Sequence, residues 1–267
     1  MSISHILAKV RESKPLVHHI TNWVTIYDCA AITRAAGALP VMAHAEEEVS
    51  EMAGIADALV LNIGTPTPQL ISSMILAGKK ANERGIPVVL DAVGAGATRL
   101  RSEKAKEIMS NVELAVIKGN KSEVAVLAGF DAKTKGVEAG EADGNPSEIA
   151  MGLAQEEGIV VVITGKTDIV AGPEGRLFFI ENGHEMMGSV VCTGCMATSL
   201  LGAFCAVEKD YPLASAAALS CFGIAGELAA RKASAPIAFK GELIDAVYSL
   251  SMDDVERMAK VIEGGKC

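Results

Sequence analysis

Aromatic residues are scarce in this chain of 267 residues: they make up 4% of it, and there is one tryptophan. Half of the residues are nonetheless hydrophobic, so any core has to be built mainly from aliphatic side chains and alanine. A chain of this length can bury such a core within one domain. We therefore expect a single domain over residues 1–267.

Clusters of basic residues are also missing. The formal net charge is −9, and lysine and arginine are dispersed along the chain. Nucleic acids and anionic membranes both require a concentrated positive surface, so these partners are excluded and a small-molecule substrate is expected. The N-terminus shows no basic segment followed by an apolar run, and glycine, threonine or charged residues interrupt the apolar stretches before 18 residues. We expect a cytoplasmic protein without a membrane span.

The six cysteines lack the regular spacing of a disulfide framework, and a chain of this size does not need one. Cys29, Cys205 and Cys221 are expected to be buried thiols. Cys192 and Cys195 differ, because they form a C-x-x-C pattern at a predicted helix start, as in thiol oxidoreductases. Their place two thirds along the chain disfavours that alternative, and no second Cys or His pair has the spacing of a zinc site.

Both common phosphate-binding fingerprints are absent: there is no Walker-type loop and no Gly-x-Gly-x-x-Gly after a first strand. Another helix N-terminus must therefore hold an anion. Thr193, Gly194 and Cys195 open a long helix rich in Ala, Leu and Ser. Free N–H groups and the positive end of the helix dipole favour a negative charge there. We expect an anion hole at residues 193–195.

Apolar runs alternate with helical patterns through the middle of the chain. Because the runs are continuous rather than alternating, they predict strands buried on both faces, and hence an α/β fold with a mostly parallel sheet between helices. An antiparallel pair is expected near 168–180, and the acidic, Gly-rich segment 131–146 predicts a mobile surface loop. The predicted strands are 58–63, 86–91, 114–118 and 158–164; the predicted helices are 67–84, 102–111, 121–128, 146–157, 194–208, 212–232 and 241–263.

Each predicted strand is followed by polar residues, and ligands bind beyond the carboxyl ends of strands in open parallel sheets. Asp91 and Glu123 are candidate Mg²⁺ ligands, although a turn cap and a helix N-terminal carboxylate are the structural alternatives. Lys118 can neutralise a phosphate, and Thr164 with Gly165 allow close approach of a nucleotide. This set of residues suits phosphoryl transfer.

In their order and spacing, the segments 18–24, 40–42, 62–65, 91–98, 118–123, 164–165 and 193–196 make the chain resemble the hydroxyethylthiazole kinase family of the ribokinase-like superfamily. The resemblance covers nearly the whole length. It implies a three-layer α/β sandwich, assembled as a homotrimer with active sites at subunit interfaces. It also implies transfer of the γ-phosphate of ATP, with Mg²⁺, to the hydroxyl of 4-methyl-5-(2-hydroxyethyl)thiazole in thiamine salvage.

By motif position, the resemblance also implies residue roles. The catalytic set is Thr193, Gly194 and Cys195; the thiazole pocket contains Asn22, Met42, Gly64, Cys192 and Gly194; Lys118, Asn120, Thr164 and Gly165 contact ATP; and Asp91 with Glu123 organises Mg²⁺.

Cys195 stands where the wider superfamily usually carries an aspartate base. A thiol with an ordinary pKa near 8.5 is a poor base at neutral pH, so we expect Cys195 to assist rather than dominate catalysis. Three further departures from the family pattern are Ala92 for a proline, Lys118 for an arginine, and Cys192 for a glycine or alanine. The last puts the local backbone conformation in question.

Two alternatives remain open. One is a kinase of another small alcohol, such as a hydroxymethylpyrimidine or a sugar, although Met42 with Val41 and Ile20 favours a flat heterocycle. The other is a non-catalytic binding protein on the same scaffold, which is disfavoured by the combined presence of Asp91, Glu123, Thr164 and Cys195.

Overall fold

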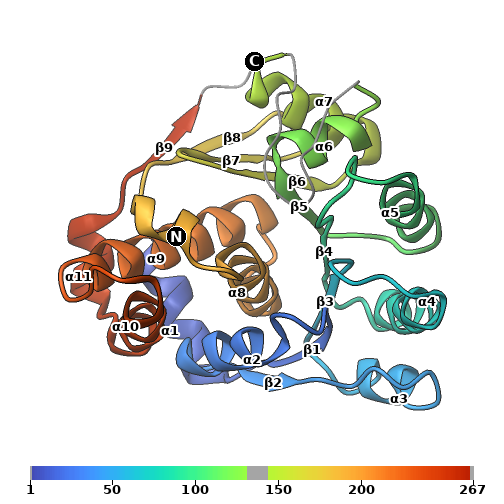
Figure 1. The fold of residues 1–267 in the computed structure, drawn as a ribbon, viewed down its shortest axis with the longest axis horizontal. Helices are drawn as coiled ribbons and strands as arrows, with labels where there is room; N and C mark the ends of the chain where they lie inside the picture. Colours follow the sequence, from blue (N-terminus) through green and yellow to red (C-terminus); the bar gives the residue numbers. More distant parts are fainter. Residues whose placement is uncertain (1, 131–143, 265–267) are drawn as a thin grey trace.

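The computed structural model describes residues 2–130 and 144–264, and one nine-stranded sheet runs through them (Figure 1). The strand order is β2-β1-β3-β4-β5-β6-β7-β8-β9. The first six strands are parallel, and the last three run antiparallel to their neighbours. The strands are β1 (Leu16–Ile20), β2 (Leu39–Val41), β3 (Ala58–Asn62), β4 (Val88–Asp91), β5 (Val116–Asn120), β6 (Val160–Thr164), β7 (Asp168–Ala171), β8 (Leu177–Ile180) and β9 (Val261–Gly264).

Helices cover both faces of this sheet, which makes a three-layer sandwich (Figure 1). One face carries α1 (Ile3–Ser13), α2 (Ile26–Ala35), α8 (Thr193–Val207), α9 (Tyr211–Ala230) and α10 (Pro236–Ser249), with the short η1 (Glu185–Ser189) and α11 (Met252–Met258) nearby. The other carries α3 (Val49–Ala53), α4 (Pro68–Arg84), α5 (Arg99–Asn111), α6 (Lys121–Leu127) and α7 (Pro146–Glu157). The expected α/β architecture is confirmed.

The predicted elements of the middle of the chain are confirmed with small shifts at their ends. The four predicted strands are β3 to β6, and the expected antiparallel pair is β7 and β8. The predicted helix 241–263 is wrong. The chain breaks at Leu250, Ser251 caps the separate helix α11 together with Asp254, and the last residues pair with β8 as β9. Residues 131–143 of the predicted mobile loop lie outside the described residues.

Helix α9 differs from the expectation that no apolar stretch is long enough to cross a membrane. By length and composition it is long and apolar enough to cross a membrane, because the glycines and serines within it do not bring its mean hydropathy of 1.5 down far enough to exclude it. It is also a core helix here, since most of it is buried and it packs against α8, α10 and α1. Its composition therefore fits an interior position in this fold.

The connections of the sheet locate a crevice. The chain passes from β1 to β2 through α2 on one face, and from β3 to β4 through α4 on the opposite face. β1 and β3 are neighbours, so the connections that leave their carboxyl ends diverge to opposite faces at a topological switch point, where open α/β sheets bind ligands. The site is therefore expected beyond the ends of β1, β3, β4 and β5.

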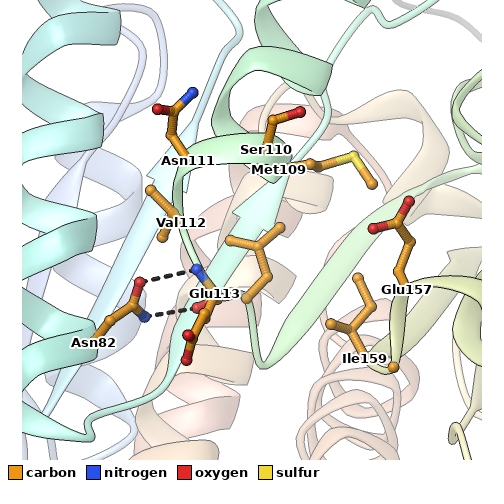
Figure 2. Close-up of a pocket in the computed structure, with 10 residues that line it drawn as sticks. Asn82, Met109, Ser110, Asn111, Val112, Glu113, Glu157 and Ile159 are labelled. Atoms are coloured by element: carbon orange, nitrogen blue, oxygen red, sulfur yellow. Dashed lines mark hydrogen bonds between the residues drawn. The ribbon is translucent and has the colours of Figure 1, made fainter.

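A pocket of about 600 Å³ lies on the opposite side of the sheet's strand ends, at the amino termini of the strands (Figure 2). The Asn82 side chain there bonds the backbone N–H and C=O of Glu113 at 2.8 Å each. Its wall is built by the ends of α4, α5 and α7 and the residues before β5 and β6, so it is separate from the strand ends that carry the polar motifs. Its lining includes Asn82, Met109, Ser110, Asn111, Val112, Glu113, Glu157 and Ile159.

Gly202 lets α8 lie close to the sheet, and we expect Gly202→Ala to lower the free energy of unfolding by roughly 1–3 kcal/mol. An added Cβ would stand 2.4 Å from Cγ2 of Val60 and 3.3 Å from Cγ1 of Val17. Gly152→Ala in α7 is the matched control, because its Cβ meets nothing within 4 Å and should stabilise the helix by about 0.5–1 kcal/mol. Urea unfolding measures both; equal stability of the two variants would contradict this packing.

Candidate active site

Three polar side chains stand in a row at the carboxyl ends of β3, β4 and β5. Asn62 is directly opposite Asp91, and Asp91 is opposite Lys118 in the parallel ladders. Side chains alternate along each strand, so these three share the face on which Val60 and Val89 enter the core under α8. The row thus continues an apolar stripe at the point where the strands end.

The Asp91 carboxylate is the centre of this row and is fully buried. Its Oδ1 accepts a hydrogen bond from Lys118 Nζ at 3.1 Å, and its Oδ2 accepts from Asn62 Nδ2 at 2.9 Å and Thr198 Oγ1 at 2.7 Å. Burial by itself lowers the pKa of Lys118, but Asp91, Glu123 and Cys195 outweigh it, so the net shift is upward. Lys118 is therefore a fixed positive charge at neutral pH.

Helix α8 begins directly above the row. Its N-cap residue, Cys192, makes no side-chain cap, so the N–H groups of Thr193, Gly194 and Cys195 are not taken by a capping side chain. A Cβ on Gly194 would lie 3.1 Å from Lys118 Nζ, which places the ammonium against the first turn. The backbone N–H groups of this turn and the lysine charge thus meet at one point, as anion binding requires.

The Cys195 thiol lies at the end of this turn, within reach of two amides. Nδ2 of Asn62 is 3.3 Å and Nδ2 of Asn22 is 3.5 Å from Sγ. Burial and the nearby Asp91 charge raise the thiol pKa, and Lys118 only partly opposes them. The thiol is therefore protonated at neutral pH, in keeping with a secondary role in proton transfer.

Cys192 faces away from Cys195, toward α2 and α10. Its Sγ donates to Asp28 Oδ2 at 3.0 Å, and Lys240 pairs with the same carboxylate at 3.0 Å. Both thiols are free, and burial, with Asp28, raises the pKa of Cys192 as well. Separate partners and raised pKa values are unlike the activated thiols of an oxidoreductase. The backbone at Cys192 has φ of 86°, a left-handed conformation that suits the glycine of the family pattern but not its alternative, alanine.

Glu123 lies beside the row as part of a capping box. Its Oε1 accepts from the Gly94 N–H and its Oε2 from the Asn120 N–H, both at 2.7 Å, while the Asn120 side chain caps α6. Burial raises the pKa of Glu123, against the pull of Lys118. No three His, Cys, Asp or Glu side chains among residues 2–130 and 144–264 form a metal-binding group. One unshared position on Asp91 Oδ1 and one on each Glu123 oxygen still suit a Mg²⁺ bound mainly through phosphates and water.

The opposite wall of the site is formed by the residues after β6. Thr164 Oγ1 lies 3.4 Å from the Gly119 carbonyl, and the Gly165 N–H donates to Asp168 Oδ1 at 2.9 Å. Burial raises the pKa of Asp168 to about 7, although Gly165 and Lys118 oppose it. The turn after β6 is thus held in one shape beside Asn120 and Lys118. The four sequence-predicted nucleotide residues lie in β5, at the end of β6 and directly after it.

The remaining wall is formed by the segments after β1, β2 and β3. Asn22 follows β1, and a Cβ on Gly64 would approach its side chain to 2.9 Å. Met42 follows β2, one strand further out, and is half-buried. The structure therefore brings Asn22, Gly64 and Cys195 together and leaves Met42 at the rim.

Sequence reasoning missed three residues that shape the site. Asn62 belongs to the motif 62–65, and a buried strand that ends in an amide beside Asp91 signals a paired side chain. Thr198 lies four residues after Gly194, so helical spacing could have placed it on the same face. Arg101 joins two loops by donating to the carbonyls of Ile63, Val93 and Gly64, and no sequence pattern marks it.

Comparison with known proteins identifies the family of this chain. A model of the "Hydroxyethylthiazole kinase family" matches residues 7–253. A hydroxyethylthiazole kinase from Methanosarcina acetivorans is 56% identical over 94% of this chain and 96% of its own length. The structure of the hydroxyethylthiazole kinase protein from Pyrococcus horikoshii superimposes with a TM-score of 0.89 at 40% identity, covering 98% and 99% of the two chains.

The fold alone is shared more widely. An ADP/ATP-dependent NAD(P)H-hydrate dehydratase from Bacillus subtilis superimposes with a TM-score of 0.63 at 13% identity over 96% of this chain and 97% of its own. The family model and the two similar relatives together define a kinase. Within that class, the chain belongs to the hydroxyethylthiazole kinase family.

Proposed function

We propose that this chain transfers the γ-phosphate of ATP to the hydroxyl of 4-methyl-5-(2-hydroxyethyl)thiazole. The observation that carries the proposal is the start of α8 above the Asp91–Lys118 pair. There, N–H groups free of a capping side chain and a fixed cation face one point. Phosphoryl transfer depends mainly on positioning and charge neutralisation, which these groups supply.

In this proposal each side of the site has one task. The N–H groups of residues 193–195 and Lys118 stabilise the charge that develops on the transferred phosphoryl group. Asn120, Thr164 and Gly165 line the nucleotide side, while Asn22, Met42 and Gly64 line the thiazole side. Cys192 adjoins the thiazole side through its backbone, since its side chain points to Asp28. Cys195 lies between them and orients the acceptor hydroxyl.

A divalent cation fits the proposal, because the unshared positions on Asp91 and Glu123 are hard oxygens. Bound there, Mg²⁺ would neutralise phosphate charge. Lys118, which pairs with Asp91, can hold a phosphate oxygen as a point charge.

The test is an assay of ADP formation with Mg²⁺-ATP and three separate acceptors: the hydroxyethylthiazole, a hydroxymethylpyrimidine and ribose. We expect ADP formation to depend on the thiazole. ADP release with only the pyrimidine or only ribose would replace the substrate assignment, and release with none of the three would favour a binding protein. Omitting Mg²⁺ in a parallel reaction tests the cation.

We further propose a homotrimer with active sites at subunit interfaces, located in the cytoplasm and built from single-domain subunits of residues 1–267. Exposed apolar side chains around the start of α2 and α8 support the shared site: Val24 is 68%, Tyr27 80% and Val191 72% exposed. Light scattering should give about three times the chain mass of 27.7 kDa. A monomeric mass would contradict the interface site.

A further inference from the structure

We propose that Asn62 is a positioning residue for phosphoryl transfer, because its amide holds the Cys195 thiol and the Asp91 carboxylate in one arrangement. The inference rests on the proposed function, in which the acceptor hydroxyl lies beside Cys195. Asn62 is 1% exposed. Its neighbours cover its side chain, so it acts through them.

The amide of Asn62 uses all of its hydrogen-bonding capacity. Its Oδ1 accepts from the Gly64 N–H and from Asn22 Nδ2, both at 2.9 Å. Its Nδ2 donates to Asp91 Oδ2 at 2.9 Å and to Cys195 Sγ at 3.3 Å. A side-chain amide has two donor hydrogens and two acceptor positions, so every one of them is occupied.

These partners also determine which way the amide faces. The Gly64 N–H can only donate, so the oxygen must point to it, and the nitrogen must then point to Asp91 and Cys195. Rotation of the amide would place its nitrogen against a backbone N–H and its oxygen against a carboxylate. The hydrogen bonds to Oδ1 on one side of the amide therefore fix the N–H donor that faces the Cys195 sulfur on the other side.

Asn22 supports the same geometry from β1. Its Oδ1 accepts from the N–H groups of Val24 and Thr25 at 3.1 Å each, and its Nδ2 is 3.5 Å from Cys195 Sγ. Two amides of fixed orientation thus donate toward one sulfur atom. The charged groups near the sulfur are Asp91 and Lys118, and Asn62 contacts the first of them.

The effect of removing Asn62 should therefore depend on how strongly the side chain at position 195 accepts a hydrogen bond. A thiol sulfur is a weak acceptor, a carboxylate accepts strongly, and alanine accepts nothing. Asn62→Ala should therefore lower kcat most in a Cys195→Asp background, less in the natural chain and least in a Cys195→Ala background. In the natural chain we expect a loss on the order of tenfold to hundredfold, with a smaller change in KM for either substrate.

The experiment measures kcat and KM for Asn62→Ala in all three backgrounds, after the activity of each background has been established. Asn82→Ala is the control, because it also removes a hydrogen-bonded side-chain amide, but one whose two bonds go to Glu113 at the opposite end of the strands (Figure 2). It should lower the denaturation midpoint and leave kcat unchanged in every background.

Equal losses in the three backgrounds, or a loss matched by Asn82→Ala, would overturn the positioning role. A natural chain without thiazole-dependent ADP formation would instead contradict the proposed function, and an inactive Cys195→Asp or Cys195→Ala protein would contradict the assisting role of Cys195. If Asn62→Ala does not fold, Asn62→Ser takes its place, since a single hydroxyl donor cannot replace both N–H donors of the amide. The same gradient across backgrounds is expected.

Discussion

Asp91→Asn is expected to lower kcat on the order of 10²–10³-fold and the free energy of unfolding by about 3–5 kcal/mol. The substitution preserves shape but removes the charge that compensates Lys118, whose side chain is 5% exposed. A buried ion pair contributes little net stability, but an uncompensated buried charge is costly. Phosphoryl-transfer rates and urea unfolding measure the two effects.

The pH dependence of stability should reverse in this variant. In the natural protein the folded-state pKa of Lys118 is raised above its ordinary 10.5, so its contribution is present below that pH and is lost as pH rises through the folded-state pKa. Without Asp91, we expect burial to lower the folded-state pKa of Lys118. The unfolded chain then binds more protons, and stability rises with pH up to about 10.5.

Adding Lys118→Met to Asp91→Asn separates stability from catalysis. The double variant buries neither charge, so we expect it to regain most of the lost stability and to remain inactive. An active double variant would show that the pair is not part of the catalytic site. A fully stable Asp91→Asn protein would contradict the cost assigned to the unpaired lysine.

Cys195→Ala is expected to lower turnover by about tenfold, below the 10²–10⁴-fold that a well-matched general base contributes. The reason is the raised pKa of the thiol, which is protonated at neutral pH. Cys195→Asp should retain or improve turnover, because a carboxylate at the start of α8 accepts from Asn22 and Asn62 and is a better base. Steady-state kinetics with the thiazole acceptor measure both.

The pH profiles distinguish the two side chains. If the thiol accepts a proton, activity of the natural enzyme rises with pH into the alkaline range, because only the thiolate is a base. Cys195→Asp should give a flat profile near neutral pH, since its carboxylate is already ionised. An unchanged rate for Cys195→Ala would remove the base role of Cys195 altogether.

Much of the fold follows from local pattern. Uninterrupted apolar runs predicted β3 to β6 because these strands are buried on both faces, and polar strand ends indicated the edge of the sheet that carries the site. The same reasoning failed at 241–263, where β9 depends on pairing with β8 rather than on its own periodicity. Local pattern also predicted no helix or strand within residues 1–57. The short strand β2 in this region contains Pro40 and depends on its pairing with β1.

The sequence by itself determined which groups are available: the carboxylate of Asp91, the lysine at 118, and a cysteine at the start of a long helix. Only the tertiary structure decided how they are used. Strand register places Asn62, Asp91 and Lys118 side by side, Gly202 lets α8 approach them, and a left-handed backbone turns Cys192 toward Asp28. These are contacts between residues far apart in the chain, and their geometry depends on packing that no local pattern encodes.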